Sequence, residues 1–128
     1  MKSFKQHILE KLKVSVRNTT KHTLFPKTKD ELKQMIRDEI SKNGNECSLN
    51  HIDVSEITDM SNLFYGSNFN GDISDWDVSN VIDMGFMFTY SNFNRDISNW
   101  DVSSLKNIDH TFDRSPLENN PPKWYKKI

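Results

Sequence analysis

The sequence predicts an α/β fold, a short solenoid of parallel stacked strands and short helices behind an N-terminal helical cap. A 24-residue period is the main observation, because Trp76, Trp100 and Trp124 recur at that interval. Residues 55–78 and 79–102 are identical at 14 of 24 aligned positions. A fixed period of this length is typical of units that bury their apolar faces against one another. The apolar content of 34% is low for a globular core but suffices for a narrow column of repeated positions.

Residues 1–27 are predicted to form a basic N-terminal helix and a linker. Phe4, Ile8 and Leu12 recur at every fourth position and form one apolar stripe on this helix. The helix has three candidate roles: docking on the acidic middle of the chain, pairing with a second copy through this stripe, or binding nucleic acid or an acidic membrane surface. The positive charge of the helix favours docking on the acidic middle of the same chain. A homo-oligomer that forms through the apolar stripe remains an alternative.

Residues 28–47 are predicted to form a capping helix. Thr28 is a suitable N-cap, Glu31 lies at the capping-box position three residues later, and Gly44 follows where the chain must leave the helix. The apolar positions share one helical face, which we expect to cover the first repeat: Leu32, Met35, Ile36 and Ile40.

Residues 48–112 carry the repeats. Each unit contains an Ile-x-x-Trp-x-Val segment, such as Ile73 to Val78, whose spacing predicts a strand with the tryptophan facing the core. An Asp-Met-x-x-Met-Phe segment follows, and its spacing predicts a short helical turn. We therefore expect Trp76 and Trp100 in the core and Trp124 half exposed at the end of the stack. Residues 113–128 are predicted to form a C-terminal cap, because prolines there cannot extend a sheet ladder.

The repeated Phe-Asn-x-Asp-Ile-Ser-x-Trp-Asp-Val-Ser-Asn-Val run, followed by Asp-Met-x-x-Met-Phe, resembles the BspA-like leucine-rich-repeat proteins. The resemblance extends from Ser48 to about Trp124. It implies a right-handed leucine-rich-repeat-like solenoid and a role in adhesion or protein binding rather than catalysis. This chain resembles a short version of the family without a signal peptide.

Charge is segregated along the chain and points to a recognition surface. Residues 1–42 carry 11 Lys and Arg against 5 Asp and Glu, whereas residues 43–112 carry 2 against 11. The acidic positions between core residues should point outward on one strand face. The candidate partner-binding residues are His51, Asp53, Asp75, Asp77, Asn99 and Asp101.

The aspartate series Asp53, Asp77 and Asp101 is open to two further interpretations. Each carboxylate can accept hydrogen bonds from the serine that follows it, which gives a purely structural ladder of turns. A calcium site is the other alternative, although the glycine-rich nonapeptide pattern of calcium-binding solenoids is absent.

Nothing in the sequence predicts catalysis, a metal site or a cofactor. The four histidines and the single cysteine, Cys47, show no ligand or nucleophile spacing, and no phosphate-binding glycine loop is present. No apolar run is long enough for a secretion signal or for membrane insertion. We therefore expect a cytoplasmic protein of a bacterial cell, which a phage can also encode.

The predicted function is a non-enzymatic protein-binding repeat module. It recognises a partner protein through its acidic strand face and adjacent loops, and we expect that partner to be basic if electrostatic attraction governs binding. Nucleic acid is not the expected partner. The alternative is a phage-type intracellular inhibitor that mimics nucleic acid and occupies the groove of a basic enzyme.

Overall fold

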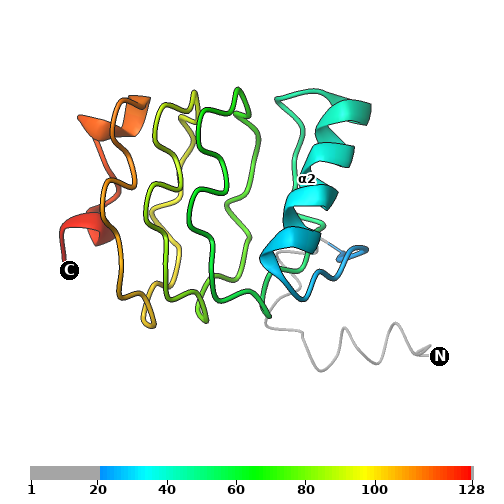
Figure 1. The fold of residues 1–128 in the computed structure, drawn as a ribbon, viewed down its shortest axis with the longest axis horizontal. Coiled ribbons are helices and arrows are strands. Elements are labelled where there is room, and N and C mark those ends of the chain that lie inside the picture. The colour runs from blue at the N-terminus through cyan, green and yellow to red at the C-terminus, as the bar shows by residue number, and fades with distance from the viewer. Residues whose placement is uncertain (1–20, 128) are drawn as a thin grey trace.

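A computed structural model describes residues 21–127 of the chain. Helix α2, Lys29–Asn43, lies at one end, and the repeats follow as successive turns of chain stacked side by side (Figure 1). Two short 3-10 helices, η2 at Pro116–Glu118 and η3 at Lys123–Lys127, close the other end. We call residues 55–78, 79–102 and 103–126 the first, second and third units. The predicted basic helix, with Phe4, Ile8 and Leu12, lies outside the described residues.

The predicted fold class is wrong. Across residues 21–127 the structure forms no strand and no sheet, so the chain is not an α/β solenoid of parallel stacked strands with short helices. Pairing of strand type is limited to three isolated parallel bridges: Leu24 with Ile52, Asp59 with Asp83, and Asp83 with Asn107. The units stack with irregular backbone instead.

Tight turns explain why the predicted strands do not form. The amide of Trp76 donates to the carbonyl oxygen of Ile73 over 3.2 Å, and Trp100 repeats this bond to Ile97 over 3.3 Å. A four-residue turn of this kind folds the chain back on itself, whereas a strand needs extended backbone throughout. The Ile-x-x-Trp-x-Val spacing therefore predicts which side chains face the core. The backbone between these residues, however, forms a tight turn at a corner of the stack rather than a strand.

Alternating hydrogen bonds replace both the sheet ladder and the predicted helical turns between Met60 and Gly66. The amides of Met60, Asn62 and Phe64 donate to carbonyl oxygens of the second unit over 2.9–3.0 Å. The intervening amides bond within their own unit. This alternation requires left-handed backbone at fixed positions, with φ between 57° and 66°: Asn62, Gly66, Phe86, Tyr90, His110 and Arg114.

The predicted capping helix is present as α2. The hydroxyl of Thr28 accepts from the amide of Glu31 over 3.2 Å, and the amide of Gly44, with a φ of 89°, donates to the carbonyl oxygen of Ile40. The side chains of Leu32 and Ile36 are buried in the core that continues into the repeats. Helix α2 thus covers the apolar face that the first unit would otherwise expose.

Aromatic side chains form the columns of the core. The rings of Phe64, Phe88 and Phe112 stack in succession with centroids 5.5 Å apart. The indoles of Trp76 and Trp100 lie 6.5 Å apart and nearly parallel, which confirms that the tryptophans face the core. Trp124 is only 8% exposed. The expectation that it is half exposed is therefore wrong, because its indole stacks on that of Trp100 and meets the ring of Tyr125 edge-on.

Candidate partner-binding surfaces

The predicted aspartate series forms the turns at one corner of the stack. Oδ1 of Asp53, Asp77 and Asp101 accepts from the backbone amide of the serine two residues later, over 2.9, 3.0 and 3.0 Å. Asp77 also accepts from the hydroxyl of Ser79 over 2.6 Å. These are the bonds expected of a structural turn ladder, so that interpretation is confirmed for one oxygen of each carboxylate.

Two further series make the same bond at other corners, and the sequence argument missed them. Asp72 and Asp96 each accept from the amide of the serine two residues on, over 2.9 Å, and Asp59 does so from Ser61. In the third unit, Asn107 makes the corresponding bond with its side-chain oxygen. The recurring Asp-x-Ser pattern is the signal that identifies these corners at Asp59, Asp72 and Asp96, but not the one at Asn107.

Local hydrogen bonds favour the ionised form of Asp53 and Asp101. Bonds from the hydroxyl and amide of Ser103 lower the pKa of Asp101. Partial burial acts to raise the pKa of Asp53, but bonds from Ser55 and the charges of His22 and Lys27 outweigh it and lower that pKa. In both cases the lowered pKa stabilises the charged form of the carboxylate.

The remaining predicted residues divide between the same surface and helix α2. Asp75 and Asn99 are exposed, and the backbone amide of Asp75 donates to the side chain of Asn50 over 3.0 Å. His51 lies instead against the helix, where its Nε2 is 3.0 Å from the carboxylate of Glu39. His51 therefore joins the repeats to α2, whereas Asp75 and Asn99 remain on the outer surface.

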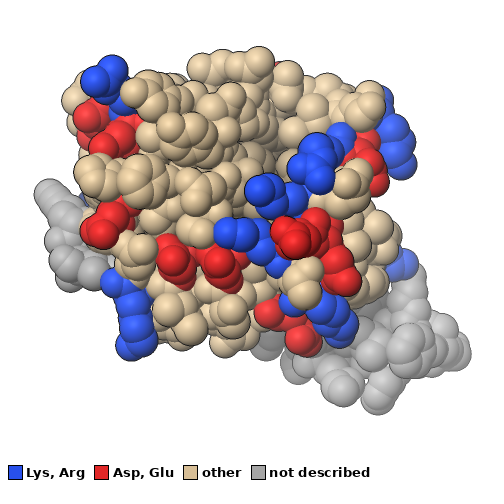
Figure 2. Space-filling model, in the orientation of Figure 1, with Lys and Arg blue, Asp and Glu red and all other residues tan. Residues whose placement is uncertain are grey.

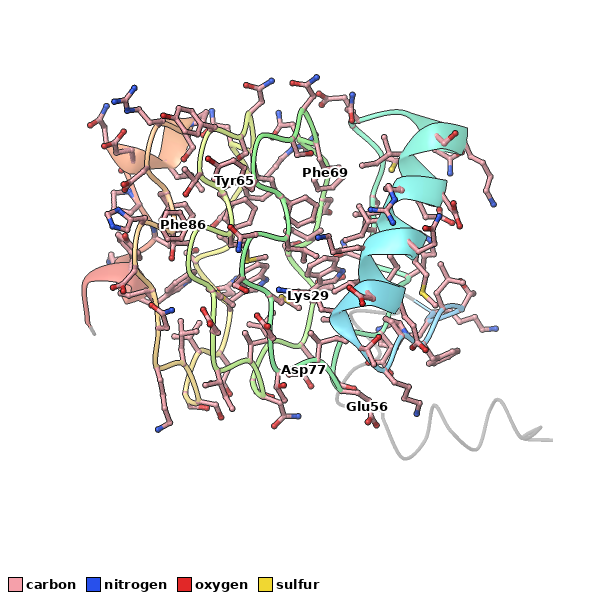
Figure 3. The ribbon with its side chains drawn as sticks, in the orientation of Figure 1. Lys29, Glu56, Tyr65, Phe69, Asp77 and Phe86 are labelled. Carbon is pink, nitrogen blue, oxygen red and sulfur yellow. The ribbon has the colours of Figure 1, made fainter. Side chains whose placement is uncertain are left out.

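A cluster of exposed aromatic side chains was not predicted from the sequence. Tyr65, Phe86 and Tyr90 are 49%, 39% and 54% exposed. Tyr65 lies 5.9 Å from Tyr90, Phe86 lies 4.9 Å from His110, and the guanidinium of Arg114 sits 5.8 Å above the ring of Tyr90. We call Tyr65, Phe86, Tyr90, His110 and Arg114 the aromatic face. Tyr65 and Phe86 project from the middle of the stack (Figure 3).

The aromatic face belongs to a surface area that has no charged side chains at its centre and charged side chains along its edge. Figure 2 shows an upper central area of the stack without Lys, Arg, Asp or Glu, with charged side chains below it and on both flanks. A protein interface commonly has this arrangement, with aromatic residues at its core and a polar rim.

Four members of the aromatic face, Phe86, Tyr90, His110 and Arg114, have an unfavourable backbone conformation. Phe86 and Tyr90 have φ values of 57° and 60°, in the left-handed region. This region costs a non-glycine residue about 1–2 kcal/mol. The first unit has Gly66 at the position that Tyr90 occupies in the second. No periodic pattern marks Phe86 and Tyr90 as exposed, because their orientation depends on this backbone conformation.

A groove crosses the three units at the corner between the aspartate series and the next turn. Its volume is about 710 Å³. We call it the corner groove, and it is lined by Ser55, Glu56, Thr58, Asn80, Ile82, Ser103, Ser104 and Lys106. Glu56 and Asp77 lie at the lower edge of Figure 3, away from Tyr65 and Phe86. The groove and the aromatic face are thus separate surfaces.

The described part of the chain offers little support for a metal site or for a reactive thiol. No cluster of three or more His, Cys, Asp or Glu side chains there is arranged to hold a metal ion, and no helix there is long and apolar enough to cross a membrane. Desolvation, and next the negative charge of Glu39, raise the pKa of the Cys47 thiol. A raised pKa disfavours the thiolate that nucleophilic chemistry needs.

Comparison with known proteins gives a family but no activity. Residues 30–127 match the family model described as "Mycoplasma protein of unknown function, DUF285". No curated protein and no solved structure matches the chain. The resemblance to BspA-like proteins therefore stays a prediction. Since the match covers well over half of the 128 residues, the chain belongs to the DUF285 family of mycoplasma proteins of unknown function.

Proposed function

We propose that this protein is a non-enzymatic protein-binding module whose contact surface is the aromatic face. One observation carries the proposal: Phe86 and Tyr90 expose their rings from left-handed backbone that glycine would adopt at lower cost. The stacking pattern imposes this conformation on every unit, and the first unit has Asn62 and Gly66 at these positions, whereas the second has exposed aromatic rings despite the cost in backbone strain. Exposed aromatic side chains add little to the stability of the free protein, so a binding role accounts for them better than a structural one.

The residue types of the aromatic face support a protein partner. Tyrosine and arginine are enriched among the residues that contribute most to protein–protein binding, and phenylalanine is enriched in interfaces. The face is also rigid, because amides of each unit are bonded to carbonyl oxygens of the next at every second residue. A surface that is already ordered loses less conformational entropy on binding.

The acidic surface remains a second, untested prediction, as does the nucleic-acid mimic that would use it. The turn bonds employ one oxygen of each aspartate and leave its charge in place. Asparagine can make the same turn, as Asn107 does. Asp77→Asn together with Asp101→Asn should therefore remove charge without removing the corner, so that any loss of binding reports on charge.

Affinity capture with matched variants tests the proposal. The full chain, the triple variant Tyr65→Ala, Phe86→Ala, Tyr90→Ala, and the control Phe25→Ala would be used to capture proteins from a mycoplasma lysate. Phe25 is 56% exposed and lies outside the aromatic face. We expect a protein retained by the wild type and the control but lost with the triple variant, while thermal unfolding shows that all three are folded. Equal retention by the triple variant would reject the proposal.

A further inference from the structure

We infer that the corner groove binds an extended segment of a partner protein, with a basic side chain at the end formed by Glu56 and an apolar side chain on Ile82. The groove takes its lining from equivalent positions of three successive units, so it runs along the stack. Units related by parallel bridges lie about 4.8 Å apart, which gives roughly 10 Å between the outer positions. An extended segment of about three to five residues, rising about 3.3 Å per residue, matches this length.

Ile82 supplies the apolar contact. Its side chain is 43% exposed in the middle unit, between Thr58 of the first unit and Lys106 of the third. Its backbone is held on both sides, because its amide donates to Thr58 over 2.8 Å and its carbonyl oxygen accepts from Lys106 over 2.8 Å. The isoleucine is therefore presented at a defined position on the groove floor.

Charge gives the groove a direction. Glu56 is exposed at the first unit, and the equivalent positions of the next two units are the uncharged Asn80 and Ser104. The carboxylates of Asp53, Asp77 and Asp101 lie on the adjoining corner beside all three units and give no direction. Lys106 stands at the opposite end. A basic side chain is thus attracted more strongly at the first unit, beside Glu56, than at the third, beside Lys106. Hydroxyl groups of Ser55, Thr58 and Ser104 line the path between them and can bond the main chain of the bound segment.

Side chains alternate along an extended segment, so every second residue faces the groove. The recognised pattern is accordingly a basic residue followed two positions later by an apolar one. This inference is independent of the aromatic face, since the two surfaces share no residue.

Peptide titration of the ¹⁵N-labelled full chain tests the inference by NMR. The probe is acetyl-Gly-Lys-Ser-Leu-Ser-Gly-amide, compared with peptides in which Glu replaces Lys or Ser replaces Leu. We expect saturable shifts of the amide signals of Glu56, Ile82 and Lys106, and binding about threefold weaker for each altered peptide, as for loss of one exposed contact.

Charge reversal makes the test specific. Glu56→Lys should reverse the preference, so that the peptide with Glu binds more tightly than the peptide with Lys. The matched control Asp38→Lys reverses an exposed carboxylate on α2 and should leave the preference unchanged. Ile82→Ser should remove the advantage of Leu. The inference is overturned if no peptide shifts these signals at millimolar concentration, if all three peptides bind equally, or if Glu56→Lys does not change the order.

The aromatic triple variant separates this result from the proposed function. It should bind the probe as the wild type does. If lysate capture is insensitive to the triple variant while the probe still binds the groove, the proposed aromatic contact fails and the groove inference stands.

Discussion

The indole Nε1 of Trp100 donates to the carbonyl oxygen of Ile73 over 3.1 Å, joining the second unit to the first through a buried side chain. Trp76 and Trp124 make the equivalent bonds to Leu49 and Ile97 over 2.9 Å. Each tryptophan therefore fills the core and also satisfies a corner carbonyl of the preceding unit. A side chain that only filled space could not replace it.

Replacing Trp100 with Phe should lower the free energy of unfolding by more than its lost volume suggests. The variant removes buried indole atoms and one of the two donors to the carbonyl oxygen of Ile73, which keeps the amide of Trp76. Loss of one such hydrogen bond costs about 0.5–1.5 kcal/mol in addition to the lost burial. Urea unfolding followed by circular dichroism measures the change. Phe25→Leu, at an exposed position, is the control and should stay within about 0.5 kcal/mol of the wild type. A Trp100→Phe variant as stable as this control would contradict the role of the bond.

Stability should fall in acid because of the corner aspartates. Hydrogen bonds with Ser98 lower the pKa of Asp96, and those with Ser74 and other neighbours outweigh partial burial to lower that of Asp72. A folded-state pKa below the unfolded value gives stability that is present above the unfolded pKa and lost as pH falls through the folded pKa. Urea unfolding between pH 7 and pH 2 should show a decline that begins near pH 4, the ordinary range of aspartate.

Asparagine substitutions at these corners should remove the carboxylate charge while keeping the hydrogen bond of the turn. Asp72→Asn combined with Asp96→Asn keeps an acceptor for the serine amides, as Asn107 does in the third unit. The double variant should fold at pH 7 and lose less stability between pH 5 and pH 2 than the wild type. An unchanged acid profile would show that other groups govern the acid response.

Gly71→Ala should destabilise the fold strongly. A Cβ at this position would collide with the carbonyl oxygen of Cys47, a backbone atom that cannot rotate away. Overpacking of a well-packed interior costs about 1–3 kcal/mol, and occasionally more where backbone must move. Gly85→Ala is the matched control, because its Cβ would meet mainly the side-chain atoms of Asn107 and Asp83 at 3.0 and 3.2 Å. Thermal melts of the two variants should rank Gly71→Ala well below Gly85→Ala.

The left-handed backbone at Tyr90 can be measured with two substitutions that both remove the ring. Tyr90→Gly suits a φ of 60°, as Gly66 does in the first unit, whereas the branched side chain in Tyr90→Val opposes it. We expect the glycine variant to be more stable by about 1–2 kcal/mol in urea unfolding. Equal stability would mean that the backbone at this position carries no strain, and the argument from strain to function would fail.

Much of the architecture follows from periodicity, but the elements do not. Trp76, Trp100 and the capping residue Thr28 are placed correctly from spacing alone, because burial and capping depend on local patterns. The backbone between the core positions was assigned wrongly, since a side chain can face the core from a strand or from a tight turn with the same spacing. The exposure of Phe86 and Tyr90 was not predicted either, because it also depends on the backbone conformation rather than on spacing.

The sequence by itself establishes that 24-residue units stack, that their tryptophans face inward and that a helix covers the first unit. Those conclusions need only the recurrence of apolar and capping residues. Only the tertiary structure decides that the units join through turns rather than strands, that the aspartates hold the corners, and that Tyr65, Phe86 and Tyr90 gather outside. These features depend on backbone dihedral angles and on hydrogen bonds between units 24 residues apart, which no local pattern encodes.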